Sequence, residues 1–239
     1  TNQIVTWVGF SETADVLVSS NKKGIEARSG ETGKALWKKT AEGKGFKGHP
    51  ENLWDRVILW KDRIIDQRGP GLSYDLKTGE PIMQKHPITG EEIPWQFTKA
   101  GHHCNYAIAS PHLVTFRAAT AGFLDIESGT TGRLEGFRSG CRNSLIPANG
   151  VLNAPNFAHG CSCSYNIFTS LALVHIPDVE LWTYSAFAKK DSPVNRLGIN
   201  LGAPGDRVAK NGTMWLDYPN VGGPSPDVQV QTSPRAPSY

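Results

Sequence analysis

Hydrophobic and polar positions alternate in short runs along this chain, and the 3.6-residue period of an amphipathic helix is hard to find. Residues 15–20, "DVLVSS", predict one strand, and residues 24–39, "GIEARSGETGKALWKK", predict two more joined by the turn "GETGK". The same succession of short runs and turns recurs in residues 55–84, 106–137 and 144–184, of which the last is the most divergent. The pattern predicts an all-β protein.

The repeated segments align on a Thr-Gly turn that precedes the last strand of each unit. Thr32, Thr78 and Thr131 begin these turns, which gives spacings of 46 and 53 residues. A period of this length, with about four strands per unit, is typical of the blades of a β-propeller. Asn149-Gly150 favours a type I′ hairpin turn. A β-sandwich with coincidental spacing is the alternative, because regularly spaced short strands suit both folds.

The pattern changes near residue 184. Residues 1–184 are predicted to form the blades. Residues 185–221 are rich in Gly, Pro, Asn and Asp and predict an irregular extension with one clear strand in "TMWLDY". Residues 222–239 predict a tail or linker rich in Pro and Gly.

The units "GIEARSGETGKALW" and "YDLKTGEPI" resemble the PQQ-like (quinoprotein-like) β-propeller repeat. Residues 136–174 and 196–226 are similar to large secreted PQQ-like propeller proteins of planctomycete-type bacteria. The resemblance implies four-stranded antiparallel blades, about four of them in this chain, within a ring of seven or eight that includes further blades outside this segment. A closed four-bladed ring is the alternative. The resemblance also implies a periplasmic or secreted location, for which the segment itself offers no signal peptide.

Composition and charge narrow the functional classes. A net charge of +3, with 38% hydrophobic and 20% charged residues, indicates a soluble globular protein. Lys and Arg occur in no run longer than a pair, so we expect no nucleic-acid partner. No apolar stretch approaches the roughly 18 residues that a membrane helix needs.

The family resemblance does not extend to a cofactor. Quinone-binding members use an adjacent Cys-Cys pair and acidic Ca²⁺ ligands, and neither pattern is present in this sequence. The segment "CSCSY" lacks the Cys-x-x-Cys-His spacing of c-type haem attachment. We therefore expect neither PQQ nor haem, and Zn²⁺ is the one cofactor that the sequence leaves open.

Whether the chain binds Zn²⁺ depends on its four cysteines. In a blade, the loop between strands 2 and 3 and the connection to the next blade emerge on one face, which places Cys104, Cys141, Cys161, Cys163 and His159 on one rim. Cys104 and Cys141 precede neighbouring innermost strands and should lie within reach of each other, while Cys161 and Cys163 should point the same way. Three interpretations are open: disulfide pairs, a Zn²⁺ site with three or four thiolates and His159, or free thiols.

A second candidate site lies on the same rim. His102 or His103, Tyr165 and Arg142 would suit acid–base elimination on a uronate, as in some propeller-fold polysaccharide lyases, with Arg142 stabilising the developing charge. No lyase motif matches residue by residue, and structural histidines or metal ligands are the alternative.

The first functional hypothesis is a non-catalytic binding or scaffolding module that presents one loop-rich face to a glycan or a protein partner. The alternatives are a polysaccharide-active enzyme and a protein with a metal or redox site.

Overall fold

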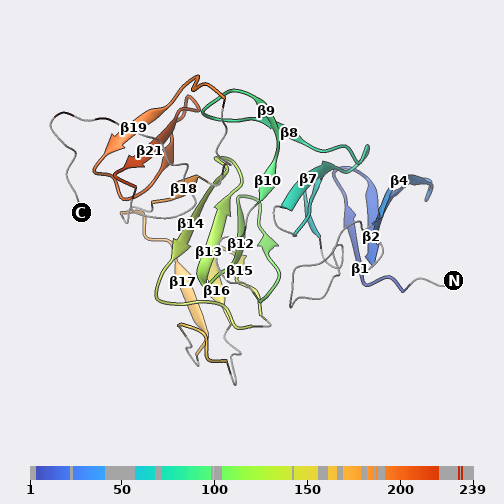
Figure 1. Cartoon of the computed structure of the whole chain (residues 1–239). Helices are drawn as coiled ribbons and strands as arrows, with labels where there is room; N and C mark the ends of the chain where they lie inside the picture. Colours follow the sequence, from blue (N-terminus) through green and yellow to red (C-terminus); the bar gives the residue numbers. More distant parts are fainter. Residues whose placement is uncertain are drawn as a thin grey trace. The chain divides into compact units, whose positions relative to one another are not determined.

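The computed structural model describes residues 4–21, 24–40, 57–67, 71–97, 99, 104–141, 143–155, 161–165, 169–178, 182–185, 187, 192–220, 231 and 233. The regular secondary structure of these residues consists of 21 strands, without a helix (Figure 1). The chain divides into two compact units, Thr1–Met83 with Pro94–Thr98 and Gln84–Ile93 with Lys99–Tyr239. The protein is therefore all-β, as its sequence pattern predicts.

The first sheet of the first unit contains four antiparallel strands in chain order, which are β1 (Trp7–Ser11), β2 (Val16–Asn21), β3 (Gly24–Ser29) and β4 (Ala35–Thr40). In β2, Val16 and Val18 are buried and Leu17 between them is exposed, because successive side chains of a strand point to opposite faces. This up-and-down sheet of four strands has the architecture of a propeller blade.

The second sheet of this unit pairs β5 (Ile58–Trp60), β6 (Arg63–Ile65), β7 (Gly71–Asp75) and β10 (Gln96–Phe97). The repeat places its last strand directly after Thr78-Gly79, and this placement is wrong. Pro81 forms only an isolated bridge with Tyr74, and β10 completes the sheet after the hairpin of β8 (Met83–Lys85) and β9 (Glu92–Pro94). Proline has no N–H to donate to a ladder, so a full strand does not form at residue 81.

The two sheets of the first unit share one hydrophobic core. Its buried members are Ala14, Val16, Val18, Ile25, Ala27, Val57, Ile64 and Leu76, and Trp7, Trp37, Leu59 and Tyr74 pack against them. Trp37 also joins the sheets through a hydrogen bond, since its Nε1–H donates to the Leu76 carbonyl at 2.8 Å. Trp37 of the first repeat thus contacts the turn of the second repeat.

A turn with glycine in the left-handed region follows the third strand of each of the first three repeats. Gly33, Gly79 and Gly129 have φ of 67°, 73° and 71°, and each N–H donates at 2.9 Å to the carbonyl four residues earlier. Glycine adopts this conformation without a steric cost. Alignment of the third repeat on Thr131 is wrong, because Thr131 lies inside β14 and Ser128 occupies the turn position, 50 residues after Thr78.

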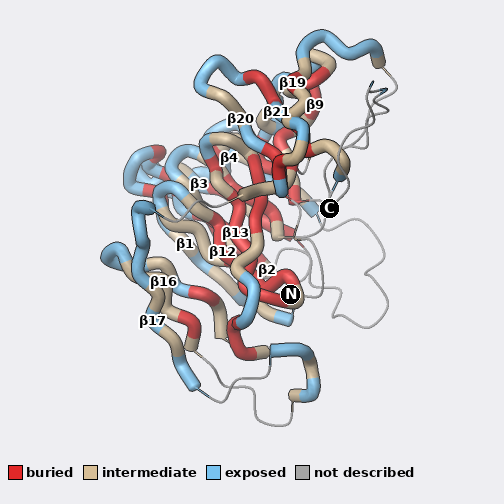
Figure 2. Tube along the Cα trace, turned by 90° about the vertical axis from the view of Figure 1, so that its left-hand side faces the viewer, coloured by how far each residue is buried: buried red, intermediate tan, exposed pale blue. Residues whose placement is uncertain are grey.

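The second unit contains a sheet in the order β11 (Ile108–Ala109), β12 (Leu113–Ala118), β13 (Thr120–Asp125), β14 (Thr130–Leu134) and β18 (Tyr184–Ser185). Strands β12 and β13 are buried along nearly their whole length, as the red segments in Figure 2 show. Both faces of β12 and β13 are therefore covered, although these strands also contain the polar residues Thr115, Arg117 and Thr120.

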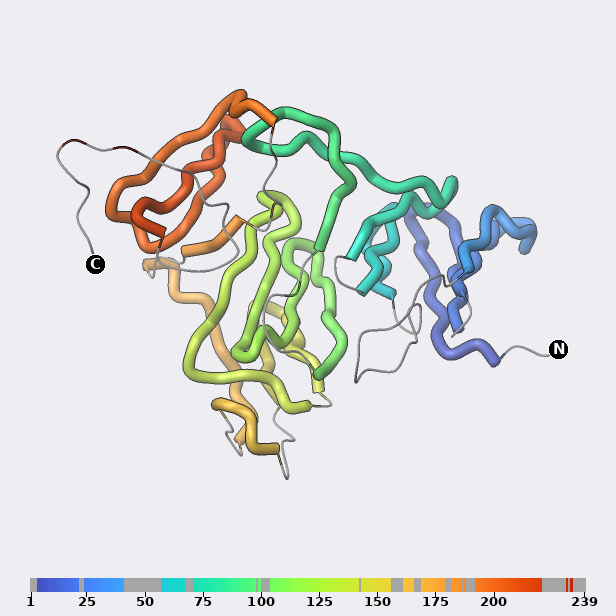
Figure 3. The backbone as a smooth tube through the Cα atoms, in the orientation of Figure 1, coloured from blue at the N-terminus to red at the C-terminus, as the bar shows by residue number. Residues whose placement is uncertain are grey.

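The fourth repeat departs most from the blade pattern. It forms a sheet of β15 (Ile146–Ala148), β16 (Val151–Ala154) and β17 (Leu171–Val174), and the next described strand, β18, pairs with β14 instead of β17 (Figure 3). Asn149 and Gly150 both have positive φ, 51° and 76°, between paired strands β15 and β16, which confirms the predicted type I′ turn.

Residues 198–218 form a separate small sheet. In it β21 (Met214–Tyr218) lies between β19 (Gly198–Leu201), to which it is parallel, and β20 (Arg207–Val208), to which it is antiparallel. Asp206 links this sheet to β18, since its carboxylate accepts the N–H of Ser185 at 2.8 Å and that of Asp217 at 3.0 Å.

Candidate functional site

The connections at one end of the sheets in the second unit bring reactive side chains together. Cys104 lies before β11, Cys141 lies before β15, and Cys161 and Cys163 lie between β16 and β17. Arg117 comes from the end of β12 and Arg138 from the connection between β14 and β15. We call these six residues the thiol cluster.

Contacts run through the whole thiol cluster. The Sγ atoms of Cys141 and Cys161 are 3.2 Å apart, with Cys141 as the donor. Cys104 makes a side-chain hydrogen bond with Cys141, and Cys161 makes one with Cys163. All four cysteines are free thiols, Cys104 exposed and the other three half-buried.

Each arginine of the thiol cluster contacts a different sulfur of the central pair. Arg117 Nη1 lies 3.4 Å from Cys141 Sγ, and Arg138 Nη2 lies 3.2 Å from Cys161 Sγ. Arg138 is held in place by the carbonyls of Ser164 and Ser139, to which its Nε and Nη1 donate at 2.8 and 3.0 Å. The relative exposures of Arg117 and Arg138 are only 0% and 4%.

Arg117 is an unusual buried cation. Among the residues that the structure describes, no carboxylate pairs with it, and its Nε has no hydrogen-bond partner. Burial opposes its charge, but hydrogen bonds to Cys141 and Cys163 and the charges of Cys104 and Cys141 outweigh burial and raise the pKa of Arg117. Because a buried charge is costly unless it is paired, the sulfur atoms of Cys141 and Cys163 are the partners that Arg117 requires.

The surroundings in the thiol cluster shift the pKa values of Cys161 and Cys104 in opposite directions. The backbone N–H of Cys163, the Cys141 thiol and the Arg138 guanidinium lower the pKa of Cys161 to about 6, although burial acts in the opposite direction. Burial raises the pKa of Cys104, Arg117 opposes this increase, and interactions with Cys141 and Cys163 add to it. At neutral pH, Cys161 is thus a thiolate and Cys104 is a thiol.

Asn105 connects two backbone segments of the thiol cluster. Its Nδ2 donates to the Ser139 hydroxyl and to the carbonyls of Asn143 and Gly140, at 2.6 and 3.4 Å for the carbonyls. These bonds tie the segment of Cys104 to the segment of Cys141. The sequence predictions did not include Asn105, Arg117 or Arg138, although an arginine inside the apolar strand "LVTFRA" is a signal of a buried, paired cation.

The Zn²⁺ interpretation finds no support in this geometry. Within the described part of the chain, no group of three or more His, Cys, Asp or Glu side chains is arranged to hold a metal ion. His159 lies outside the described residues. The Zn²⁺ site therefore remains a prediction.

The predicted acid–base residues are described only in part. His102, His103 and Arg142 lie outside the described residues. The Tyr165 hydroxyl donates to Glu135 Oε2 at 3.2 Å, and this hydrogen bond and the carboxylate charge raise the pKa of Tyr165. A neutral phenol bound to a carboxylate is a poor proton acceptor, so the described part of this candidate site does not suit a catalytic base.

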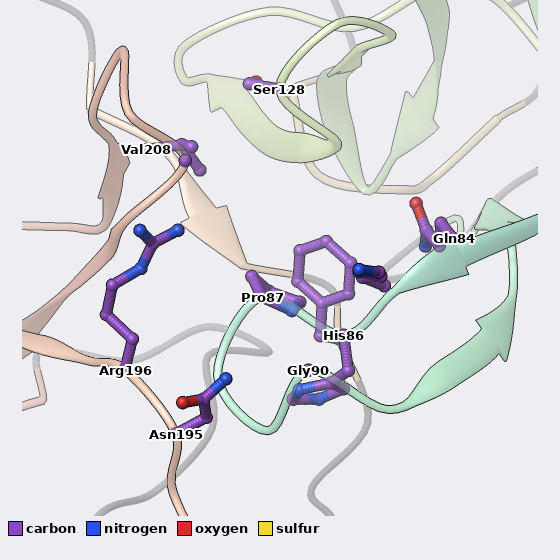
Figure 4. A pocket seen from close by; sticks show the side chains of 11 residues that line it. Gln84, His86, Pro87, Gly90, Ser128, Asn195, Arg196 and Val208 are labelled. Atoms are coloured by element: carbon purple, nitrogen blue, oxygen red, sulfur yellow. The ribbon is translucent and has the colours of Figure 1, made fainter.

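A cavity of about 500 Å³ lies elsewhere in the second unit (Figure 4). His86, Pro87 and Gly90 line one side of it, and Asn195 and Arg196 line another. Its volume falls in the range of small-molecule sites. The principal polar groups are engaged in the fold, however, because His86 Nδ1 accepts the N–H groups of the turn that follows it and Arg196 donates to a carbonyl.

That turn is a further copy of the repeated one. Gly90 has φ of 76° and donates to the His86 carbonyl, and His86 Nδ1 accepts from the next two N–H groups after Pro87 at 3.2 Å each. Asp75 Oδ1 has the same role in the second repeat, where it accepts two N–H groups at 2.9 and 2.8 Å. The side-chain acceptor therefore differs between copies while the turn geometry is kept.

The sheets of the first three repeats consist of antiparallel strands, and the same glycine turn follows the third strand of each repeat. The fold is that of β-propeller blades. No protein-family model matches the chain, and no curated protein matches it. In the part of the chain that the structure describes, we find no helix with the length and apolarity required to cross a bilayer.

The solved structures that are similar to this chain include BamB and the WD40 repeats of RRP9. BamB from Moraxella catarrhalis has a TM-score of 0.43 and 15% identity, over 65% of this chain and 48% of BamB. The WD40 repeats of RRP9 have a TM-score of 0.40 and 10% identity, over 73% of this chain and 52% of that one. The chain spans about half the length of each of these structures.

Proposed function

We propose that this chain is a non-catalytic scaffolding module that binds a protein partner through an apolar face of its first sheet. We call the side chains of Val8, Phe10 and Leu17 the open face. Their relative exposures are 61%, 51% and 39%, and Phe10 and Leu17 are directly opposite each other across β1 and β2. Contiguous exposed apolar surface of this kind marks an interaction site. This is the observation that carries the proposal.

The second sheet supports the choice of partner. Leu59 and Ile64 form the second residue pair from their hairpin turn, as Phe10 and Leu17 do in the first sheet. In the second sheet this pair packs into the core of the first unit, against the inner face of the first sheet. Leu59 comes so close to β1 that a Cβ on Gly9 would meet its Cδ1 at 2.7 Å. The partner that fits the open face is therefore a β-sheet with an apolar face, such as another blade.

The resemblance of the repeats to secreted propellers supports an extracytoplasmic location for this scaffold. A glycan partner is less well supported than a sheet, because a glycan requires polar groups beside aromatic rings and the open face offers aliphatic side chains and a single phenylalanine.

A second copy of the chain, which carries the same open face, is a convenient probe. Sedimentation velocity over about 1–100 µM should show association of the wild type and its loss in the variant Phe10→Lys/Leu17→Lys. Val174→Lys is the matched control, since Val174 is an exposed apolar residue on a different sheet. A wild type that stays monomeric, or a control variant that also loses association, would contradict the assignment of the open face.

The non-catalytic part of the proposal is tested separately. A screen of uronate-containing polysaccharides for the absorbance of unsaturated products should show no turnover. Turnover that is lost in His103→Ala would replace this proposal with the lyase hypothesis.

A further inference from the structure

We propose that Cys141 and Cys161 form a thiol–disulfide exchange site, at which the protein reacts reversibly with low-molecular-weight disulfides. This inference is independent of the proposed scaffolding role, because the thiol cluster lies in the second unit and the open face in the first.

The two sulfurs are positioned to bond to each other. Their separation is 3.2 Å, and a disulfide requires about 2.0 Å. Cys141 lies between β14 and β15 and Cys161 between β16 and β17, so both are in connections outside the hydrogen-bonded ladders. A closure of about 1 Å is therefore open to these segments without the loss of a strand pair.

The arginines favour the dithiol form over a permanent disulfide. Arg138 donates to Cys161 and Arg117 to Cys141, and both guanidiniums are buried. Oxidation turns the Cys161 thiolate and the Cys141 thiol into a neutral disulfide, which removes the anion that the buried Arg138 contacts. A cost in the oxidised state makes a disulfide easier to reduce, which is the behaviour of exchange sites and not of structural crosslinks.

The contacts also assign the two roles. Cys141 donates a hydrogen bond to Cys161, whose sulfur is therefore the acceptor and the nucleophile. The lowered pKa of Cys161, about 6, agrees with this assignment. Cys141 is then the resolving thiol, because it already points at Cys161.

The reaction has two displacements. The Cys161 thiolate attacks one sulfur of the disulfide R–S–S–R, forming a mixed disulfide and releasing R–S⁻. Cys141 then loses its proton to solvent and attacks Cys161 Sγ, which forms the Cys141–Cys161 bond and releases the second R–S⁻. Two protein thiols and one R–S–S–R become one protein disulfide and two R–SH, so the protein loses two electrons and two protons.

Glutathione disulfide is the probe for the test, applied to the whole chain, with N-ethylmaleimide to quench and peptide mapping without reductant to read the result. The tryptic peptide 139–142 should be found joined to peptide 143–189, with the mass of the pair lower by two hydrogens. Cys161 and Cys163 share the second peptide, so the Cys163→Ser variant assigns the bond to Cys161. Addition of reduced glutathione should restore both thiols.

Single-site variants separate the steps. Cys141→Ser should accumulate one glutathione on Cys161, and Cys161→Ser should take up glutathione about tenfold more slowly at pH 6, since the remaining thiols ionise little there. Cys104→Ser is the control and should still form the Cys141–Cys161 bond. Circular dichroism confirms that each variant is folded.

Three results would overturn the inference. They are four free thiols after full exposure to glutathione disulfide, a bond that joins Cys104 to Cys163 in the wild type, and protection of all four thiols by added Zn²⁺ with one zinc bound per chain.

Discussion

The substitution Gly79→Ala tests whether the glycine turn of one repeat is shaped to receive the tryptophan of the preceding one. A Cβ at Gly79 would lie 2.8 Å from both Cγ and Cδ2 of Trp37, which are atoms of a rigid ring. Gly33 is the matched control, because it occupies the same turn of the first repeat with φ of 67°, against 73° for Gly79, and a Cβ there meets nothing within 4 Å.

The two substitutions share one cost and differ in another. Alanine in the left-handed region costs about 1 kcal/mol at either position. At Gly79 the Trp37 ring must also move, and such overpacking costs about 1–3 kcal/mol. Movement of the Trp37 ring would also break the 2.8 Å hydrogen bond from its Nε1 to the Leu76 carbonyl, and the loss of this bond costs about 1 kcal/mol. We expect Gly79→Ala to lower the free energy of unfolding by about 3 kcal/mol and Gly33→Ala by about 1 kcal/mol.

Urea unfolding, followed by tryptophan fluorescence and circular dichroism, measures both values. The variant Trp37→Ala closes a double-mutant cycle, since removal of the whole ring, with its Cγ, Cδ2 and Nε1 atoms, should remove the excess cost of Gly79→Ala. Equal destabilisation by the two glycine substitutions, or an excess that persists in Trp37→Ala, would refute the reasoning that Trp37 makes the difference.

Three further predictions concern the second unit. His86→Ala should cost about 1–2 kcal/mol in urea unfolding, and His86→Asp should cost less, because aspartate keeps an acceptor for the turn, as at Asp75, but loses the ring contact of the buried His86 with Phe187. Alkylation of Cys161 by iodoacetamide should slow about tenfold from pH 7 to pH 5, which mass spectrometry can follow, because its pKa is about 6. This pKa is below the unfolded value of about 8.5, so the stability it contributes is complete above pH 8.5 and is lost as the pH falls to about 6. Asp206→Asn replaces one of two carboxylate oxygens, each of which accepts one backbone N–H, by an NH2 group that cannot accept. The loss of this acceptor should cost about 1–3 kcal/mol, and hydrogen exchange at Ser185 would also report it.

The sequence predicts where the candidate site lies, but not which of its side chains contact one another. Blade topology alone indicates that Cys104, Cys141, Cys161 and Cys163 share a rim, and the structure connects these four side chains by hydrogen bonds. The pairing within the cluster could not be predicted, because a 3.2 Å contact depends on the course of two connections that carry no periodic pattern.

The arginines illustrate the same limit. Arg117 occupies an apolar strand in the sequence, and its buried position beside Cys141 follows only when β12 is covered on both faces. Arg138 lies 23 residues from Cys161 and reaches it because Ser139 and Ser164 orient its guanidinium.

The sequence by itself determined the local structure, which is the strands and the turns. Alternation of hydrophobic and polar residues predicts the strands. Gly33, Gly79 and Asn149-Gly150 predict turns, because glycine and asparagine adopt positive φ more readily than other residues. Tertiary structure decided the rest. Ser128, and not Thr131, occupies the turn position of the third repeat. His86 accepts the N–H groups of a turn in the way that an aspartate does. Strand β18 pairs with β14 and not with the sheet of the fourth repeat. Strand partners and buried charges depend on which surfaces meet, and that is a property of the packed chain as a whole.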